Sequence, residues 1–316
     1  MPGRDRGLSG PRMSDAGPGW SGAPATECLW CGAGLDRSAL HLAGRVVCGN
    51  CGCGTTDPLP DEASLDAAYR TYRPDGPRFA FGGEALLRRS RATLANRIDR
   101  AAPSGRVLDV GAGDGNLIDA LSALGRPSIG LERKPARDDI LDLPVSEVEG
   151  EFAAIVFWHS LEHLPDPSGA IEAAHNLLVP GGLIFIAVPD LAGRQARIFG
   201  DRWLHLDLPR HLVHLRSDSL VEGLRRRGLV TEVTSGTRAG QNLIGWLDGL
   251  VRSLPGDLNL YQALRRKGSR QIPMTETRRL LSIAAGVVLA PVAIALSAIE
   301  IATGRTGSIY VEARRA

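Results

Sequence analysis

An aspartate followed by three alternating glycines is the feature of this sequence most typical of a binding site. Residues 106–116 read R-V-L-D-V-G-A-G-D-G-N, so Asp109 lies just before Gly111, Gly113 and Gly115. Glycine lets a backbone approach a ligand closely, and the neighbouring carboxylate can hold a polar or cationic group of that ligand. The apolar residues before the loop predict a buried parallel strand that runs into a tight turn and then a helix.

Two further acids follow at the ends of the next apolar runs. Glu132 ends the run 128–131 and lies 23 residues after Asp109. An acid at the end of the second strand is where nucleotide-type α/β folds bind a ribose diol. Asp142 lies in a short third run at 138–144. We expect its carboxylate to reach an adenine amino group.

All five cysteines of the chain lie close together near its start. Cys28 and Cys31 form one C-x-x-C pair, and Cys48 and Cys51 form a second after sixteen intervening residues. Four thiolates in this pattern suit a closed tetrahedral zinc site, and its role is structural because no coordination position stays open. Cys53 is a spare thiol that could replace Cys51 as a ligand.

A third polar group, His159, Glu162 and His163, follows an apolar run, and His211 and His214 lie in a later histidine-rich loop. H-x-x-E-H is also a metalloprotease signature. That signature belongs on a helix, whereas His159 is expected at the tip of a strand. The pattern therefore does not favour peptidase chemistry.

The elements that must position these residues alternate between strands and helices. Strands are expected at 106–110, 128–131, 138–144, 152–158, 183–188, 229–233 and 308–311, and helices at 84–102, 171–178 and 217–227. Strands and helices that alternate at these lengths predict a doubly wound, mostly parallel α/β sheet.

Composition divides the chain into further parts. Residues 1–26 are rich in Gly, Pro, Ser and Arg and are expected to be disordered. The cysteine ribbon is expected at 27–57, a proline-containing linker at 58–83, the main domain at 84–239 and 307–316, and an insertion at 240–306.

The insertion contains twenty uncharged residues, 280–299, which are long enough to span a bilayer. Pro291 interrupts them, and the chain must return to the sheet at Ser308. We therefore expect one or two helices that either pack on the domain as an internal cap or lie in a membrane interface. The basic residues before this segment suit an anionic lipid surface: Arg265, Arg266, Lys267, Arg270, Arg278 and Arg279.

The net charge and the cysteine pattern indicate which partners, metals and location are expected. The formal net charge is only +2, and the basic residues are spread along the chain, so nucleic acid is not expected as a partner. Clustered cysteines favour metal over disulfides. Because no apolar signal segment is present near the start, we expect a cytoplasmic location, with membrane association through 280–299.

The glycine loop resembles the first motif of class I S-adenosylmethionine-dependent methyltransferases. The fingerprint of nicotinamide dinucleotide binding, G-x-G-x-x-G, requires glycine where this chain has Asn116. Glu132 matches the ribose-binding acid of the methyltransferase family, and the Pro-Gly-Gly turn at 180–182 also matches. The resemblance implies a seven-stranded Rossmann-like sheet with an antiparallel last strand, and S-adenosylmethionine as cofactor.

Two longer runs resemble a bacterial branch of that family with an N-terminal zinc ribbon, associated with sugar and polysaccharide biosynthesis. They are W-H-S-L-E-H-L-P-D-P and L-D-L-P-R-H-L-V-H-L. This resemblance implies O-methylation of a small-molecule or lipid-linked saccharide. C-methylation of a nucleotide sugar is a close alternative. A zinc-ribbon adaptor with a degenerate, cofactor-free domain is a third, and the intact glycine loop argues against it.

The resemblance also suggests roles for the histidines. Asp109 would face the methionine end of the cofactor, and His159 would line the methyl-transfer pocket beside it. His211 ranks first as general base, because it follows the fifth strand on the side where acceptors enter.

A second metal is an alternative role for the histidine group. Small-RNA 2′-O-methyltransferases and ubiquinone-pathway O-methyltransferases are similar here, with E-x-x-E-H after the same strand. This resemblance implies a divalent ion held by His159, Glu162 and His163, completed by His211 or His214. Histidine in place of the first glutamate suits a softer ion than magnesium.

Overall fold

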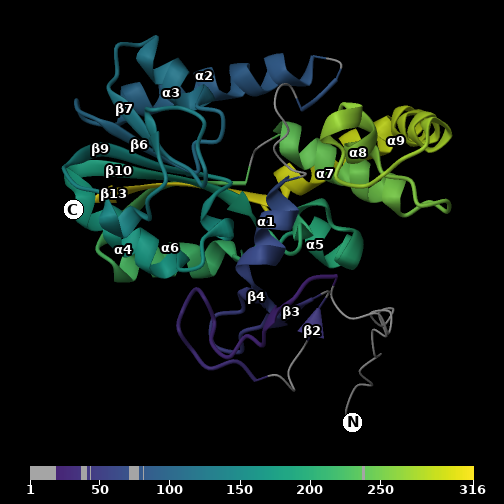
Figure 1. Cartoon of the computed structure of the whole chain (residues 1–316), viewed down its shortest axis with the longest axis horizontal. Coiled ribbons are helices and arrows are strands. Elements are labelled where there is room, and N and C mark those ends of the chain that lie inside the picture. Colours follow the sequence, from purple (N-terminus) through teal and green to yellow (C-terminus); the bar gives the residue numbers. More distant parts are fainter. Residues whose placement is uncertain (1–18, 37–40, 43, 71–77, 81, 237–238) are drawn as a thin grey trace.

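The sheet of the main domain has seven strands with helices on both faces (Figure 1). The structure is a computed structural model that describes residues 19–36, 41–42, 44–70, 78–80, 82–236 and 239–316. The strands lie in the order β12-β13-β10-β9-β6-β7-β8. Their bounds are β6 Val107–Val110, β7 Ser128–Leu131, β8 Ile140–Leu141, β9 Phe152–Trp158, β10 Leu178–Pro189, β12 Leu229–Ser235 and β13 Ser308–Arg315.

The predicted fold class is confirmed. Strands β6, β7, β8, β9 and β10 run parallel, while β13 pairs antiparallel with β10 and β12. The central strands β6 and β9 are apolar and almost fully buried because helices cover both faces. Helices α2 (Gly83–Ala101) and α3 (Asn116–Ser122) cover one face, and α4 (Pro167–Leu177) and α6 (Ser217–Arg226) the other (Figure 1).

Strand β10 begins earlier than the sequence predicts. The expected turn at 180–182 lies inside it as an irregularity, and the register against β9 shifts between Leu178 and Leu183. The other predicted strands of the sheet match within a few residues, since each is a continuous apolar run.

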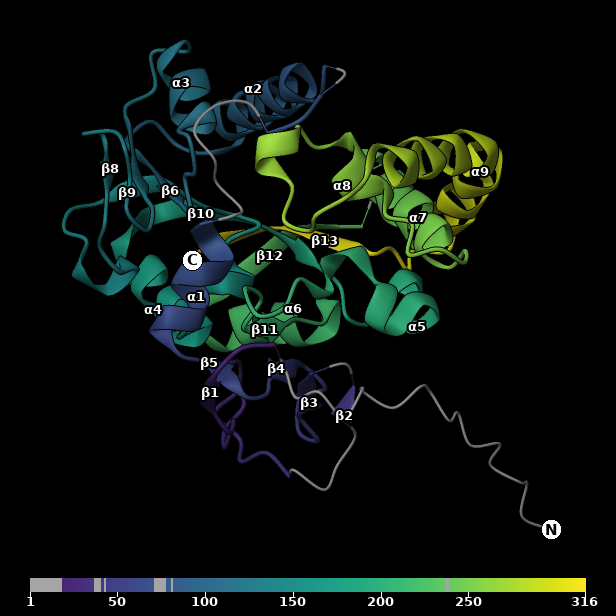
Figure 2. The ribbon, with the colours of Figure 1, turned by 45° about the vertical axis from the view of Figure 1, so that its right-hand side comes forward.

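The cysteine segment forms a small sheet of its own in the order β11-β4-β3-β2. Strands β2 (His41–Leu42), β3 (Arg45–Val47) and β4 (Gly54–Thr56) belong to it, and β11 (Val213–His214) comes from the main domain. The ribbon expected at 27–57 is therefore completed by a strand far away in sequence. Figure 2 shows β2, β3 and β4 below the main domain, next to β11.

Two expectations about the N-terminal third are wrong for the described residues. Within the segment expected to be disordered, β1 (Gly22–Ala23) pairs with β5 (Leu59–Pro60), and Ala25 is fully buried. The backbone N–H of Ala25 donates to the Asp57 carboxylate at 2.8 Å, so docking on the ribbon orders this stretch. Residues 1–18 lie outside the described part.

The predicted linker 58–83 also contains a helix, α1 (Glu62–Arg70). Its Tyr69 hydroxyl lies 3.2 Å from Nδ1 of His163, so the helix docks on the histidine loop. Nine residues are too few to show a clear helical periodicity, and the prolines on either side favour a linker. The linker residues 71–77 lie outside the described part.

The insertion forms helices α7 (Ala239–Arg252), α8 (Leu260–Leu264) and α9 (Glu276–Ala302). Helix α9 continues through Pro291 rather than stopping there. All three pack at one side of the domain (Figures 1 and 2). Arg265, which we expected to face lipid, is instead only 1% exposed, and its Nε donates to the Ser269 carbonyl.

Candidate functional site

The glycine loop lies at the carboxyl end of β6, as its sequence predicts. The backbone N–H groups of Gly111 and Ala112 donate to the Leu131 carbonyl at 2.8 and 2.9 Å, which ties the loop to β7. Gly111 has a φ of 81°, and a Cβ there would lie 2.3 Å from Cβ of Ser160. Only glycine fits, because the loop after β9 passes against it.

Glu132 and Asp142 line the same pocket as this loop. The Glu132 carboxylate accepts a 2.9 Å hydrogen bond from the N–H of Gly113, and Asp142 accepts one of 3.1 Å from the N–H of Lys134. The pocket has a volume of about 510 Å³, within the range of small-molecule sites. A carboxylate has several lone-pair directions, so Glu132 can bond a ribose while it holds the loop.

Asp109 lies beneath the loop and is 3% exposed. Burial raises the pKa of its carboxyl to about 7; the nearby Glu132 charge acts in the same direction, and Arg91 opposes it. Arg91 also lies over the Trp158 ring at 5.4 Å. Asp109 is thus a buried acid at a pocket wall, ready to ionise when a cationic group approaches.

His159 directly follows β9, has an unusual backbone conformation and lines the pocket. Its φ is +58°, which is rare for a residue other than glycine and typical of functional positions. Its Nδ1 lies 3.4 Å from Glu162 Oε1, and its Nε2 lies 2.7 Å from the side-chain nitrogen of Gln241 in α7. The imidazole is therefore oriented on one side by a carboxylate and on the other by an amide.

Glu162, His163 and His211 converge behind His159. One ligand atom from each lies within 4.8 Å of the others, and Glu162 is 1% exposed. The Nδ1 atoms of His163 and His211 each lie 2.9 Å from a backbone carbonyl, those of Arg210 and His205. An Nδ1–H that donates to a carbonyl leaves Nε2 as the ligand atom.

The donor set fits a divalent ion. Burial lowers the pKa of His163 to about 4 and that of His211 well below its usual value, so both rings are neutral near pH 7. His159 is not part of this group, contrary to our expectation, and the group takes His211 rather than His214. The Nε2 of His214 instead bonds the Leu206 carbonyl at 3.0 Å.

The expectation that His211 is the general base does not agree with its placement. Its ring lies behind that of His163, with 4.6 Å between the centroids, and it is 5% exposed. The described pocket is lined by His159 and His163 but not by His211. His159 and His163 are the histidines that line this pocket.

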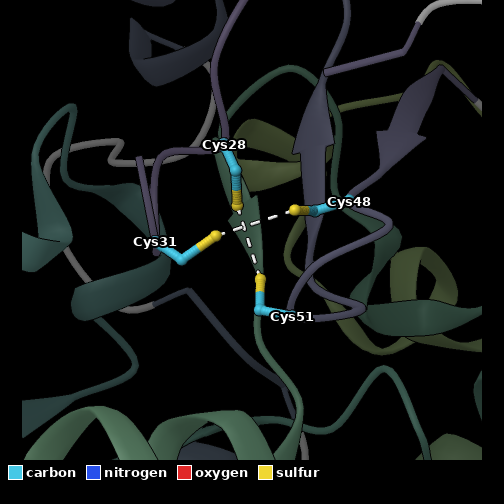
Figure 3. A group of neighbouring side chains, drawn as sticks. All are labelled: Cys28, Cys31, Cys48 and Cys51. Carbon is cyan, nitrogen blue, oxygen red and sulfur yellow. Dashed lines mark hydrogen bonds between the residues drawn. The ribbon is translucent and has the colours of Figure 1, made fainter. Parts of the chain in front are cut away.

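The four cysteines of the two C-x-x-C pairs converge on one point (Figure 3). Sulfur–sulfur distances are 3.6 Å for Cys28–Cys51 and 3.6 Å for Cys31–Cys48. Bonds of about 2.3 Å to a tetrahedral zinc would place sulfurs about 3.8 Å apart, so this group fits zinc. Cys53 lies outside this group, whose fourth thiol is that of Cys51.

The match to known proteins covers the glycine loop and most strands of the sheet. A family model described as a methyltransferase domain matches residues 84–233. The ubiquinone biosynthesis O-methyltransferase of Xanthomonas axonopodis pv. citri (strain 306) is 30% identical over 162 residues, covering 43% of this chain and 68% of that protein. The chain belongs to the methyltransferase-domain family. It is an S-adenosylmethionine-dependent methyltransferase.

The chain is also similar to a further named relative and to solved structures. The methyltransferase is 30% identical over 193 residues to the ubiquinone biosynthesis O-methyltransferase of Xanthomonas oryzae pv. oryzae (strain PXO99A), covering 54% of this chain and 79% of that protein. Among solved structures, the cyclopropane synthase MmaA2 from Mycobacterium tuberculosis has a TM-score of 0.44 at 14% identity, covering 79% of this chain and 94% of that one.

The pocket fits the cofactor of the methyltransferase family. The glycine loop, Glu132 and Asp142 lie along one wall, with Asp109 beneath and His159 at the end of β9. Sequence reasoning missed Arg91, Gln241 and Ser160 as pocket or pocket-contacting residues. Arg91 and Gln241 belong to no motif, and the packing of other helices brings them to the pocket. Ser160 lies inside the run W-H-S-L-E-H, which does not reveal its contact with Gly111.

Proposed function

We propose that this methyltransferase transfers a methyl group to a hydroxyl oxygen of a small-molecule acceptor. The observation that carries the proposal is the pair of His159 and Glu162, which places an oriented imidazole at the pocket wall near the cofactor loop. A pocket-facing base held by a carboxylate is what removal of a hydroxyl proton requires. The relatives named O-methyltransferases support the same class of acceptor atom.

S-adenosylmethionine supplies an activated methyl group on its sulfonium sulfur. In the transfer, the O–C bond to the acceptor forms as the C–S bond breaks, and S-adenosylhomocysteine leaves. The proton of the hydroxyl passes to Nε2 of His159, displacing the Gln241 amide that faces this atom. Glu162 stabilises the resulting imidazolium through Nδ1–H. Glu132 binds the ribose hydroxyls, Asp142 the adenine amino group, and Asp109 the cationic methionine end.

Two metals belong to the proposal. Zinc held by Cys28, Cys31, Cys48 and Cys51 has a structural role, because the site is closed. A divalent ion held by Glu162, His163 and His211 would supply Lewis acidity at the part of the pocket wall that His163 lines. Two histidines and one carboxylate favour a transition ion over magnesium.

For the acceptor we propose a saccharide, carried on a lipid. Support for the saccharide comes from the resemblance of the two histidine-containing runs to sugar-biosynthesis enzymes. The pocket is also lined by the aromatic rings of Trp158 and Tyr69 and by Arg91 and Arg133, whose guanidinium groups lie over these two rings. Flat rings with neighbouring hydrogen-bond donors suit an acceptor that has both apolar faces and hydroxyl groups.

The test has two parts. Calorimetric titration with S-adenosylhomocysteine should give binding to the wild type and weakened binding to Asp109→Ala, and no binding at all would refute the cofactor assignment. Incubation with isotopically labelled S-adenosylmethionine and a mixture of saccharide acceptors, followed by product analysis, locates the methyl group. A methyl group on carbon instead of oxygen would replace the O-methylation proposal with the C-methylation alternative.

A further inference from the structure

The apolar side chains of helix α9 face outward, whereas those of a surface helix in a soluble protein normally face the core. The residues buried against the domain are small or polar: Ser282, Gly286, Ala293, Ser297 and Glu300. The outward residues are large and apolar: Leu280, Leu281, Val287, Val288, Val292, Ile294 and Ile299, each between 48% and 75% exposed. A surface helix normally turns its apolar side to the core, so this outward face requires an apolar partner.

The inner face cannot exchange places with the outer one. The Glu300 carboxylate accepts hydrogen bonds from the Gln195 side chain at 2.8 Å and the Trp246 indole at 2.9 Å. Ala293 is fully buried in a cluster with Phe199, Trp203 and Trp246. Turning α9 over would bury its aliphatic side chains but would expose this cluster and break two buried hydrogen bonds to a carboxylate.

The connections of α9 keep the helix beside the domain. It packs against α7 and α8, and β13 of the main sheet begins six residues after it ends. Its 27 residues are about 40 Å long, which exceeds the thickness of a hydrocarbon core. The outward side of α9 is therefore exposed along the length of the helix. It can contact a bilayer while the helix stays packed on the domain. Figure 2 shows it at the outer edge of the molecule, beyond α7 and α8.

Exposed cationic side chains precede and follow α9 in the chain. Arg266 and Lys267 are exposed shortly before α9, and Arg305 is exposed three residues after it. Arg278 and Arg279 are engaged within the protein, with the Asp257 carbonyl and the Glu276 carboxylate. Apolar residues flanked by exposed cations complement the acyl chains and head groups of an anionic membrane surface.

We propose that the outward face of α9 docks in the interface of a membrane leaflet that contains anionic phospholipid. The helix lies parallel to the membrane, with Val287 and Val288 among the acyl chains and Lys267 and Arg305 at the head groups. The same insertion contacts the pocket, since Gln241 of α7 bonds His159. The docking surface does not depend on the identity of the acceptor, so it stands or fails separately from the proposed function.

The experiment is flotation of the full-length protein with vesicles of phosphatidylcholine alone or mixed equally with phosphatidylglycerol. Wild type should bind the mixed vesicles more tightly. The double variant Val287→Asp, Val288→Asp should lose at least about tenfold in partitioning to both vesicles, because two aliphatic side chains no longer enter the leaflet. Lys267→Glu should lose about fivefold or more on the mixed vesicles and little on phosphatidylcholine.

Leu86→Asp is the matched control, because Leu86 is also apolar and 68% exposed but belongs to α2 and not to α9. It should bind vesicles like the wild type. Since all these side chains are exposed, the variants should fold, and circular dichroism and S-adenosylhomocysteine binding check this. Equal flotation of wild type and double variant would overturn the proposal. So would a wild-type dimer that ignores vesicles and becomes monomeric in the double variant, since α9 would then contact a second copy.

Discussion

At the scale of single residues, the pocket holds its carboxylates in two different ways. Glu132 is fixed by the N–H of Gly113 at 2.9 Å, whereas Asp109 is buried in the wall and its pKa is raised to about 7. The first is suited to neutral hydroxyl groups, which need a fixed acceptor. The second gains most from a cation, because a cationic ligand offsets the cost of ionising a buried acid.

We expect cofactor affinity to depend on pH through Asp109. The carboxyl binds a cationic amino group best when ionised, so binding of S-adenosylhomocysteine should strengthen as pH rises from about 6 to about 8, through the raised pKa. Asp109→Asn should bind more weakly above pH 7 by about 1.5–3 kcal/mol and lose the pH dependence. Calorimetry over this range measures both. Asp119→Asn, on an exposed residue outside the pocket, is the control, and a flat wild-type profile would contradict the role of Asp109.

The role of His159 can be tested without disturbing its backbone. Asparagine tolerates positive φ well, so His159→Asn keeps the +58° conformation while removing the base. We expect kcat to fall by about 10²–10⁴ with little change in S-adenosylhomocysteine affinity. Steady-state kinetics and calorimetry give these two values. Unchanged kcat in His159→Asn together with an inactive Glu162→Gln would instead assign the chemistry to the group of Glu162, His163 and His211.

The residues that could be predicted from sequence are those whose neighbours in the chain are also their neighbours in space. Asp109, the glycines and Glu132 lie at strand ends, where one motif fixes both backbone and role. The ranking of His211 as base stays a prediction, and the sequence does not reveal that His211 is buried beside His163, because this burial depends on how two loops pack together. Gln241 could not be found for a similar reason, since its contact with His159 spans 82 residues.

At the scale of elements, the ribbon and the histidine loop form one structure. Strand β11 of the main domain pairs with β4 of the ribbon. The Thr56 hydroxyl donates to the His211 carbonyl at 2.6 Å, and the Leu212 N–H donates to the Glu162 carbonyl at 2.8 Å. A chain of short contacts thus connects the cysteine group to Glu162. The C-x-x-C spacing predicts the metal group but not this connection, because a two-residue strand such as β11 has no periodicity to detect.

We therefore expect the ribbon to position the histidine loop. Thr56→Val keeps the side-chain volume but leaves the His211 carbonyl without this buried donor, at a cost of about 1–3 kcal/mol. Turnover should fall several-fold while zinc content and S-adenosylhomocysteine affinity stay unchanged. Kinetics, elemental analysis and calorimetry measure the three quantities. Thr93→Val, on an exposed threonine of α2, should be neutral, and equal turnover of both variants would show that the ribbon does not position the loop.

At the scale of the whole molecule, the main sheet carries three additions: the ribbon, α1 and the insertion. Each contacts a histidine at or near the pocket. The ribbon contacts the histidine loop, α1 contacts His163 through Tyr69, and the insertion contacts His159 through Gln241. The alternation of strands and helices predicted the sheet, since each strand is an apolar run. The apolar run 280–299 predicted a helix. Its composition does not tell whether the helix contacts the protein core or lipid, because both environments favour apolar residues. In the structure the small side chains of this helix face the domain and the large apolar ones face outward, and this is why we propose lipid as the partner of the outer face.

The packing of α9 leads to a prediction about the stability of the whole molecule. Ala293 is fully buried among aromatic side chains, so Ala293→Leu should overpack the contact between α9 and the domain and destabilise the protein by about 1–3 kcal/mol. Ala298 lies on the exposed side of the same helix, and Ala298→Leu should change stability by less than about 0.5 kcal/mol. Thermal unfolding in detergent-free buffer should therefore give a lower Tm for Ala293→Leu by several degrees and an unchanged one for Ala298→Leu. Equal Tm values would mean that α9 does not pack on the domain in solution, because only a packed helix distinguishes its two sides.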